Sequence, residues 1–360
     1  MNRRTLALVA AVITFGVGVA LARLSLPNLF TTRGPAPQKE IEFSHYRISG
    51  PYAFENLSVF LIHGPDGPNH FLYTPLEEAM ERNIVIVHET SDVIELEIEN
   101  ISANEEVFVQ AGDIVRGGRQ DRVLSVDLIL PPHSGRIPIS AYCVEQHRWQ
   151  PREFESGDQF TLTEMTVSYS LRQIIKDAAT QLRVWDKVDD EQRKLTVALP
   201  HHVRSSLSPS SLALSLETQP VRESVAPYVE NLLSLAKESN DVIGVAFAVD
   251  DELIGADVYH SHWMFKRYWP RLLKAAAVQA VAASVLERES DGLAIEKVAA
   301  SLVSSERGVE TVSKINDRTQ SAKRETEDGL FFETRDIADD GAWVHRSYLV
   351  RSQGESQQIN

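Results

Sequence analysis

The sequence predicts an α+β protein in which a strand-rich N-terminal lobe with a mixed or antiparallel sheet is followed by a helix-rich lobe with a few strands. Short segments of alternating apolar and polar residues, separated by Gly- and Pro-rich turns, fill residues 41–144. Apolar residues at helical spacing then dominate residues 168–185, 221–238 and 270–289. The 360 residues, 43% hydrophobic and 24% charged, suffice for one large domain or two smaller ones.

The first lobe, residues 41–165, is expected to contain short strands and one short helix at residues 74–82. Thr74 can cap this helix, Pro75 suits its first position, and two glutamates follow that complement the helix dipole. Pro138 has no N–H group, so its strand is expected to lie at an edge or to contain a bulge. The expected strands are residues 41–48, 57–63, 71–73, 84–87, 93–99, 105–110, 123–124, 126–130 and 137–144.

The second lobe, residues 166–351, begins with the clearest amphipathic helix, at residues 168–185. The Ser-rich residues 200–220 are expected to form a long loop and to mark the best internal boundary. The nearly continuous apolar run at residues 242–249 predicts a strand buried on both faces. The remaining elements are helices at residues 221–238 and 270–289 and strands at residues 253–258, 310–315, 329–335 and 343–350.

The N-terminus carries two arginines followed by an apolar run at residues 6–22. Such a run is long enough for a membrane-spanning helix, and it also fits a signal peptide cleaved after Ala20-Leu21-Ala22. We favour an uncleaved anchor at residues 1–24, which gives a single-pass membrane protein with its body outside the cytoplasm. Cleavage would instead give a secreted or periplasmic protein. A linker at residues 25–40 and a disordered tail at residues 352–360 complete the expected organisation.

Composition excludes several classes of function. The formal net charge of −15 disfavours binding to nucleic acid, and no nucleic-acid partner is expected. The single cysteine, Cys143, excludes an internal disulfide and a multi-cysteine metal site. The chain has no nucleophile elbow, Walker loop, dinucleotide fingerprint or His-Glu-x-x-His motif. The spacing of Asp257, His260 and His262 is not diagnostic of a metal site. We therefore expect neither a cofactor nor a metal.

Polar residues that suit ligand binding concentrate in residues 111–149, in two clusters. The first surrounds Gly117-Gly118, where a hairpin that needs positive φ angles is more probable than a phosphate-binding loop. Arg116, Arg119 and Arg122 lie within seven positions of one another, beside Asp121 and other polar residues. Arginines at this density either bind phosphate or carboxylate or form an internal network with nearby carboxylates. The residues alone leave both interpretations open.

The second cluster runs from Cys143 to Trp149 and follows a predicted strand. Cys143 and Glu145 are two residues apart, so their side chains share one face of that strand. The pair suits a nucleophile with an acid or base, or a buried thiol beside a salt-bridged carboxylate. Arg148 and Trp149 could stack on a base or a sugar, although a tryptophan is more often part of a core.

These motifs resemble the ARPP family, a domain named for its association with ADP-ribosylglycohydrolases and rhodanese/phosphatase-type proteins. The resemblance covers roughly residues 75–286 and makes residues 41–351 an ARPP-like globular domain. It implies a link to NAD or ADP-ribose-type nucleotide metabolism. The chain departs from the family pattern at Asp113, where Glu is usual, and at His147, where Gly is usual. The residues that carry the resemblance are Pro75-Leu76-Glu77-Glu78-Ala79, Gly112-Asp113, Gly117-Gly118-Arg119-Gln120-Asp121-Arg122, Pro138, Cys143-Val144-Glu145, Arg148-Trp149, Val184-Trp185-Asp186-Lys187-Val188, Gly244 and Gly255-Ala256-Asp257-Val258-Tyr259.

Two functional hypotheses follow. In the first, the protein recognises or hydrolyses a phosphorylated, nucleotide-like small molecule of the ADP-ribose type. In the second, it is a non-catalytic, envelope-associated binding or structural module whose clusters form a salt-bridge network. An open cleft lined by the arginines would favour the first hypothesis, and buried, mutually paired arginines would favour the second. The first hypothesis assigns acid or base roles to Asp113, Asp121 and Glu145, and ligand binding to Arg119, Gln120, Arg122, Arg148 and Trp149.

Overall fold

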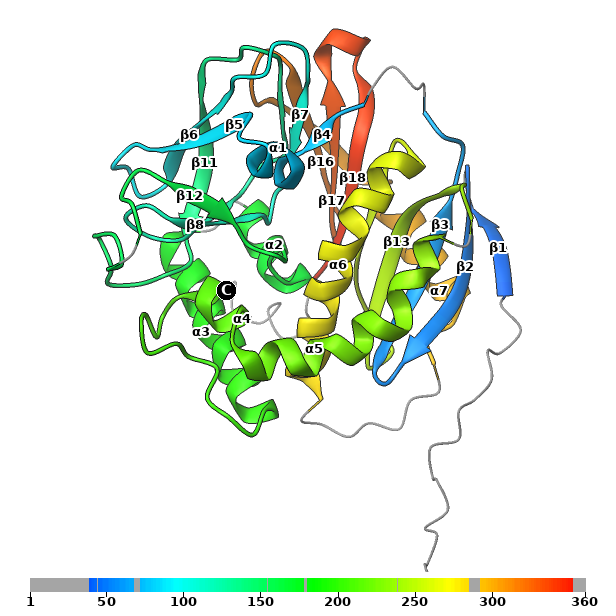
Figure 1. The fold of residues 1–360 in the computed structure, drawn as a ribbon. Coiled ribbons are helices and arrows are strands. Elements are labelled where there is room, and N and C mark those ends of the chain that lie inside the picture. The colour runs from blue at the N-terminus through cyan, green and yellow to red at the C-terminus, as the bar shows by residue number, and fades with distance from the viewer. Residues whose placement is uncertain are drawn as a thin grey trace, which may run out of the picture. The chain divides into compact units, whose positions relative to one another are not determined.

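The largest sheet has nine antiparallel strands that come from both ends of the chain (Figure 1). In the computed structural model, β3 pairs with β13 and β14 pairs with β18, so residues near 60, 250 and 345 become neighbours. In spatial order the strands are β1 (Lys39–Phe43), β2 (Tyr46–Phe54), β3 (Leu57–His63), β13 (Val242–Val249), β14 (Glu252–Tyr259), β18 (Ala342–Val350), β17 (Gly329–Asp336), β16 (Thr319–Glu325) and β15 (Val309–Lys314).

Helices cover both faces of this sheet near its centre. Alternate residues of β13 show the division: Val245 and Phe247 pack in one core with α5 (Gln219–Leu232) and α6 (His262–Ala283). Ala246 and Ala248 join a second core with α7 (Ile295–Ser305) on the opposite face. Every residue of β13 is therefore buried, as its continuous apolar sequence predicts.

Two smaller sheets and a short helix surround a third apolar core in the first half of the chain. β4 and β7 pair in parallel and the other strand pairs among the described residues are antiparallel, which confirms the predicted strand-rich, mixed or antiparallel lobe. Pro138 lies in a segment of β11 that pairs only with β6, since pairing with β9 begins at Ala141. The elements are α1 (Leu76–Glu81), the strands β10 (Leu128–Leu130), β7 (Val107–Val109) and β4 (Thr74–Pro75), and the strands β12 (Phe160–Leu162), β8 (Ile114–Gly117), β9 (Arg122–Leu124), β11 (Arg136–Cys143), β6 (Glu95–Asn100) and β5 (Val85–Glu89).

The amphipathic segment at residues 168–185 forms two helices instead of one. α2 (Tyr169–Lys176) ends before α3 (Gln181–Ala198) begins, and each has its own cap, from Ser168 and Thr180. Leu182, an apolar residue of the segment expected to form one amphipathic helix, is 63% exposed. The prediction of a single helix was wrong because a side-chain cap can restart a helix within an apolar pattern that continues.

Other boundaries also differ from the prediction. α6 begins at His262 and contains Pro270, which was expected at its start. Burial of Phe265, Tyr268 and Trp269 offsets the roughly 3 kcal/mol that an internal proline costs. The predicted strand at residues 41–48 is a hairpin of β1 and β2, and residues 72–73 are not in a strand. The expected loop at residues 200–220 contains α4 (Leu212–Leu216), and α7, β12 and β16 had not been expected.

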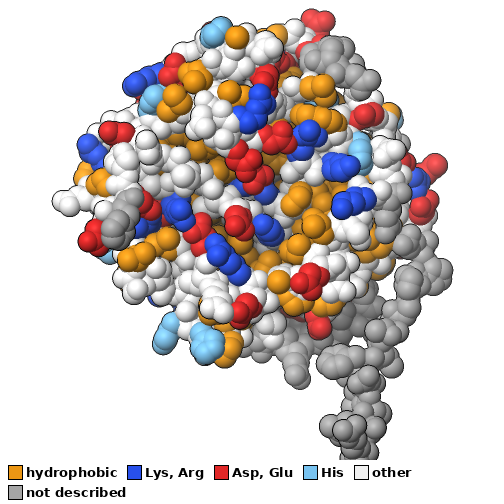
Figure 2. Space-filling view, viewed as in Figure 1, with side chains coloured by type: hydrophobic (Ala, Val, Ile, Leu, Met, Phe, Trp, Pro, Cys, Tyr) orange, Lys and Arg blue, Asp and Glu red, His pale blue; other side chains and the backbone are white. Residues whose placement is uncertain are grey.

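The structure describes residues 39–43, 45–67, 72–153, 155–177, 180–237, 239–284 and 292–351. The expected N-terminal anchor and C-terminal tail lie outside these residues. Within the described ranges, no helix is long and apolar enough to cross a membrane. Basic and acidic side chains are interspersed on the face shown in Figure 2, with no large basic patch on that face.

Candidate functional site

The first predicted cluster is a β8–β9 hairpin that turns at two glycines. Gly117 and Gly118 have φ angles of +128° and +50°, which confirms the prediction of a turn that needs positive φ. A Cβ atom on Gly118 would lie 2.3 Å from the ring of Phe160 in β12. The turn is thus packed against a neighbouring strand, and backbone geometry and packing both require glycine there.

Behind this turn, two carboxylates and two guanidinium groups form a buried cluster that we call the arginine brace, composed of Asp121, Glu145, Arg148 and Arg152. Arg152 Nη2 lies 2.5 Å from Asp121 Oδ2 and 3.1 Å from Glu145 Oε2. Arg148 Nη2 lies 2.7 Å from Glu145 Oε2 and 3.4 Å from Asp121 Oδ1. Both carboxylates are completely buried, and the four formal charges sum to zero.

Further hydrogen bonds tie the arginine brace to three segments of the chain. Ser211, the N-cap of α4, donates to Asp121 Oδ2 at 2.6 Å, and Ser208 donates to Glu145 Oε1. Arg148 donates to the carbonyl oxygens of Gly117 and Gly118 at 3.1 and 3.0 Å. The cluster therefore fastens the loop after β11 to the β8–β9 turn and to α4.

Burial and the nearby charge of Glu145 raise the pKa of Asp121, against the opposing effect of Arg152 and Ser211. The same carboxylates raise the pKa of the Arg152 guanidinium, although burial alone would lower it. The arginines are thus bound to internal acids, which leaves little capacity for an external anion.

Arg122 of the first predicted cluster is fully buried and contacts Cys143 of the second. Its Nη1 donates to Gln120 Oε1 at 3.0 Å and to Cys143 Sγ, and its Nη2 lies 3.8 Å from Glu89 Oε1. Burial raises the pKa of the Cys143 thiol to about 11, so the sulfur is protonated near neutral pH and is a poor nucleophile. Cys143 fits the interpretation as a buried thiol.

Trp149 of the second cluster reaches the surface, with 41% of its area exposed. The guanidinium carbons of Arg119 and Arg122 lie 5.6 and 5.5 Å from its ring centre, within the range of a cation–π contact. The neighbouring His147 has a φ of +65°, a backbone conformation that favours glycine, the residue usual at this position in the ARPP pattern.

Asp113 has different partners from the other two acid/base candidates. It is 1% exposed and lies 2.8 Å from Nη2 of Arg271 in α6. Arg271 also donates to the carbonyl oxygen of Thr163 and lies 3.3 Å from Glu77 of α1. The structure thus brings Asp121, Glu145 and Arg148 together and pairs Asp113 with α6. The assigned acid, base and ligand-binding roles stay predictions.

A charged network that had not been predicted lies in the core between the large sheet and α2. His345 stands between two buried carboxylates, those of Asp127 and Asp257. Arg172 of α2 lies 2.9 Å from Asp257, and Tyr169 donates to the same carboxylate at 2.5 Å. Because these residues come from four distant segments, nothing in the sequence indicated that they meet.

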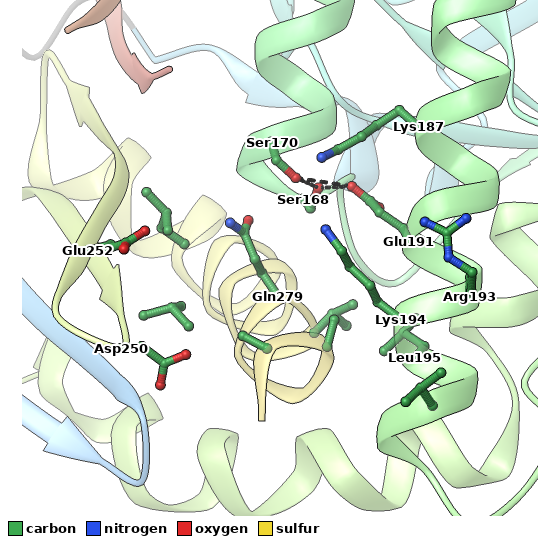
Figure 3. Close-up of a pocket in the computed structure, with 16 residues that line it drawn as sticks. Ser168, Ser170, Lys187, Glu191, Arg193, Lys194, Leu195, Asp250, Glu252 and Gln279 are labelled. Carbon is green, nitrogen blue, oxygen red and sulfur yellow. Dashed lines mark hydrogen bonds between the residues drawn. The ribbon is translucent and has the colours of Figure 1, made fainter. Parts of the chain in front are cut away.

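The structure also contains a cavity of about 550 Å³ lined by α3, α6, the start of α2 and the β13–β14 turn (Figure 3). Its volume lies within the range of small-molecule sites, roughly 300–1,000 Å³. Basic residues of α3 face it from one side and acidic residues of the β13–β14 turn from the other. Its apolar wall is formed by Leu195, Val197, Val249, Ile254, Val278, Ala282 and Ala283.

The polar end of the cavity joins α2 to α3. Glu191 Oε1 accepts hydrogen bonds from Ser168 and from Ser170, the latter at 3.2 Å. Burial raises the pKa of Glu191, although Lys187 and the two hydroxyl groups favour its ionised form. Among the described residues, Lys187 has no hydrogen-bond or ion-pair partner, and Lys194 is paired only with Asp190 on its own helix.

Gln279 of α6 contributes a further polar group to this cavity (Figure 3). Its Oε1 is buried and has no hydrogen-bond partner within the part of the chain that the structure describes. Buried polar atoms are nearly always satisfied, so an isolated amide in a cavity wall indicates a place for a ligand donor. None of these cavity residues had been predicted, except that the segment containing Lys187 resembles an ARPP motif.

Across the described residues, no group of three or more His, Cys, Asp or Glu side chains is arranged to hold a metal ion. No curated protein and no solved structure gives a significant match to the chain. A family model does match: the ARG and Rhodanese-Phosphatase-superfamily-associated Protein domain, ARPP-1, fits residues 45–349. This match covers most of the chain and includes the β8–β9 turn, the arginine brace and the cavity. The chain therefore belongs to the ARPP-1 family.

Proposed function

We propose that the protein binds a small amphipathic anion, phosphorylated or nucleotide-like as in ADP-ribose, in the cavity between α3 and α6. The observation that carries this proposal is the unpaired Lys187 ammonium in the wall of a cavity of about 550 Å³ with a largely apolar lining. An ammonium without a partner in a concave site favours an anionic ligand group, and the apolar wall favours a ring or an alkyl group beside it.

Three parts of the cavity serve three parts of such a ligand. Lys187 and Lys194 hold the anionic group, because the pairing of Lys194 with Asp190 is exposed and easily exchanged. Ile254 and Val278 pack against the apolar part. The unpartnered Oε1 of Gln279 accepts a hydrogen bond from a ligand N–H or O–H group.

In this proposal the arginine brace has a structural role. Its arginines are paired with internal carboxylates and are almost completely buried. Buried, mutually paired arginines favour a structural salt-bridge network. Removing one partner from such a network leaves an uncompensated buried charge, so all four groups are required together. Ligand recognition is thereby assigned to the cavity on α3, away from Asp121 and Glu145.

We also propose that residues 1–24 anchor the protein in a membrane with the body outside the cytoplasm, on the basis of the basic start and the apolar run. Carbonate extraction of membranes from cells that express the full chain tests this proposal. The protein should stay in the membrane fraction. Soluble protein with a mature N-terminus at Arg23 would show that the segment is a cleaved signal peptide instead.

Ligand binding is tested with two probes, the amphipathic anion 8-anilinonaphthalene-1-sulfonate and adenosine monophosphate. The protein without residues 1–38 should enhance the fluorescence of the first probe, and the second should compete with it and raise the melting temperature. Lys187→Ala should weaken both effects about tenfold. Lys266→Ala, an exposed α6 lysine outside the cavity, is the matched control and should leave both unchanged. Equal binding by the two variants would disprove the assignment of the anion to Lys187.

A further inference from the structure

We infer that the cavity is a hydrolytic site for small carboxylic esters, with Ser170 as the nucleophile and Glu191 as its general base. The inference extends the proposed function, because the same cavity would hold the substrate. It depends on the proposed function in one respect only, the position of the anionic end of the substrate. The reacting groups are assigned from the contacts among Ser168, Ser170 and Glu191, with Lys187 in the same cavity wall (Figure 3).

A serine becomes nucleophilic when a base within hydrogen-bond reach can accept its proton and a third group holds that base in place. The Oγ of Ser170 lies 3.2 Å from Glu191 Oε1, at the limit of the usual 2.6–3.2 Å range. Ser168 donates a second hydrogen bond to the same oxygen and helps to hold the carboxylate in place. Nucleophile, base and orienting group are therefore all present in the cavity wall.

The two serines have different roles. Ser168 is the N-cap of α2: its Oγ accepts a hydrogen bond from the N–H of Leu171 at 3.0 Å and donates its one proton to Glu191. Ser170 lies inside α2 and does not cap the helix. Its Oγ lies 3.0 Å from the Oγ of Ser168. When Ser170 donates to Glu191, its lone pairs remain available for attack. Ser170 is thus the nucleophile and Ser168 a positioning residue.

Glu191 is suited to act as the base. Burial raises its pKa and makes it a stronger proton acceptor than an exposed glutamate, while the nearby charge of Lys187 favours its ionised form. Its second oxygen, Oε2, has no hydrogen-bond partner among the described residues and can activate a water molecule. One carboxylate can therefore serve both halves of a two-step hydrolysis.

The start of α2 supplies groups that stabilise negative charge. The N–H groups of Tyr169 and Ser170 in its first turn have no hydrogen-bond acceptor in the described chain. These N–H groups and the nearby Lys187 ammonium favour the oxyanion that forms when an ester carbonyl is attacked. The helix terminus therefore adds to a site that the Ser170–Glu191 contact defines independently.

The chemistry needs no cofactor. Ser170 Oγ bonds to the ester carbon as its proton passes to Glu191, and the tetrahedral intermediate collapses with loss of the alcohol, which takes that proton. Water then attacks the acyl-serine while Glu191 accepts its proton. Collapse of the second intermediate releases the carboxylic acid and returns the proton to Ser170. Ester and water are the only reactants, and acid and alcohol the only products.

The test is covalent labelling of the wild-type protein with an uncharged alkyl fluorophosphonate, which a nucleophilic serine attacks with loss of fluoride. Peptide mass spectrometry should place the label on Ser170. Glu191→Gln should slow labelling about 100-fold or more, because the base is lost, and the wild-type rate should rise with pH as Glu191 ionises. Ser206→Ala, at an exposed serine of another loop, should label at the wild-type rate.

Absence of label on Ser170, or equal labelling rates for wild type and Glu191→Gln, would overturn the inference. Melting temperatures of Ser170→Ala and Ser168→Ala add a second readout. If the hydrogen bonds from the two serines to Glu191 are only structural, both variants should lose stability and the wild type should not be labelled. Since the fluorophosphonate carries no charge, labelling does not require an anionic ligand group to be bound at Lys187. A protein that binds the anionic probes without labelling would contradict this inference alone, and one that labels without binding them would contradict only the proposed function.

Discussion

The Nε2 atom of His345 lies 3.0 Å from Oδ1 of Asp257, and both side chains are completely enclosed by the core. On the other side of the ring, Nδ1 lies 2.8 Å from Oδ2 of Asp127. Burial alone would lower the pKa of His345, but the two carboxylates outweigh burial and raise it. The pKa of Asp257 falls to about 2, because Arg172 and His345 outweigh the opposing effect of burial.

These pKa shifts predict how stability depends on pH. The pKa of His345 is raised in the folded protein above its ordinary value of 6.5, so its stabilising contribution is complete below that pH and is lost as the pH rises through the folded pKa. The contribution of Asp257 is complete above 3.8 and is lost as the pH falls toward about 2. The combined contribution of these two groups to the free energy of unfolding should therefore be greatest between about pH 4 and 6.5.

Substitution of His345 measures its contribution to the free energy of unfolding separately from the contributions of other groups. His345→Gln should lower the free energy of unfolding by about 3–5 kcal/mol at pH 6, because two buried carboxylates lose the cation between them. The difference from wild type should be smaller at pH 9 than at pH 6, because the wild-type ring loses its proton as the pH rises through its raised folded pKa. Urea denaturation at both pH values measures this, with the exposed His201→Gln as control. A loss of equal size at the two pH values would show that His345 is neutral in the fold.

The arginine brace should stabilise the protein only as a complete unit. Arg152→Met should lower the free energy of unfolding by about 3–5 kcal/mol, because Asp121 and Glu145 would remain buried with one cation fewer. Chemical denaturation measures the loss. The control is Lys314→Met, which breaks the exposed ion pair with Asp317 and should change stability by less than about 1 kcal/mol. Similar small losses for both substitutions would mean that the buried pairs contribute little.

The packed turn gives a prediction about glycine. Gly118→Ala should cost about 1–3 kcal/mol beyond the backbone strain, because the new methyl group would overlap the Phe160 ring. Gly135→Ala is the matched control: its φ of +62° carries similar strain, but apart from its chain neighbours no atom of the described residues lies within 4 Å of the added Cβ. Melting temperatures of the two variants isolate the packing effect. Equal shifts would show that backbone strain alone sets the requirement for glycine.

The sequence predicted the structural features that depend on residues close together in the chain. It predicted the β8–β9 turn from Gly117-Gly118, and it singled out Asp121, Glu145 and Arg148 of the arginine brace because two short polar runs contain them. It missed Arg152, which lies on an irregular loop with no periodic pattern to place its side chain. Local patterns predict elements well, but they do not identify the partners of a loop residue.

The cavity could not be predicted, because it exists only where separate elements pack together. It requires α2 to end before α3 begins, and the continuous apolar stripe across residues 168–185 concealed that break. It also requires Gln279 of α6 to lie near Glu252 of β14, although both residues look ordinary in the sequence. The His345 network was missed for the same reason, since strand pairing across distant segments carries no local signal.

Filling the cavity should abolish ligand binding without unfolding the protein. Ala282 is a partly buried residue of the apolar wall, and Ala282→Trp would place an indole ring in the space assigned to the apolar part of the ligand. The melting temperature should stay the same or rise, because cavity-filling substitutions commonly stabilise proteins. Fluorescence enhancement of 8-anilinonaphthalene-1-sulfonate should disappear. Ala300→Trp, at an exposed position of α7 outside this cavity, should bind the probe as the wild type does. Unchanged binding by Ala282→Trp would place the probe elsewhere and remove the cavity from consideration.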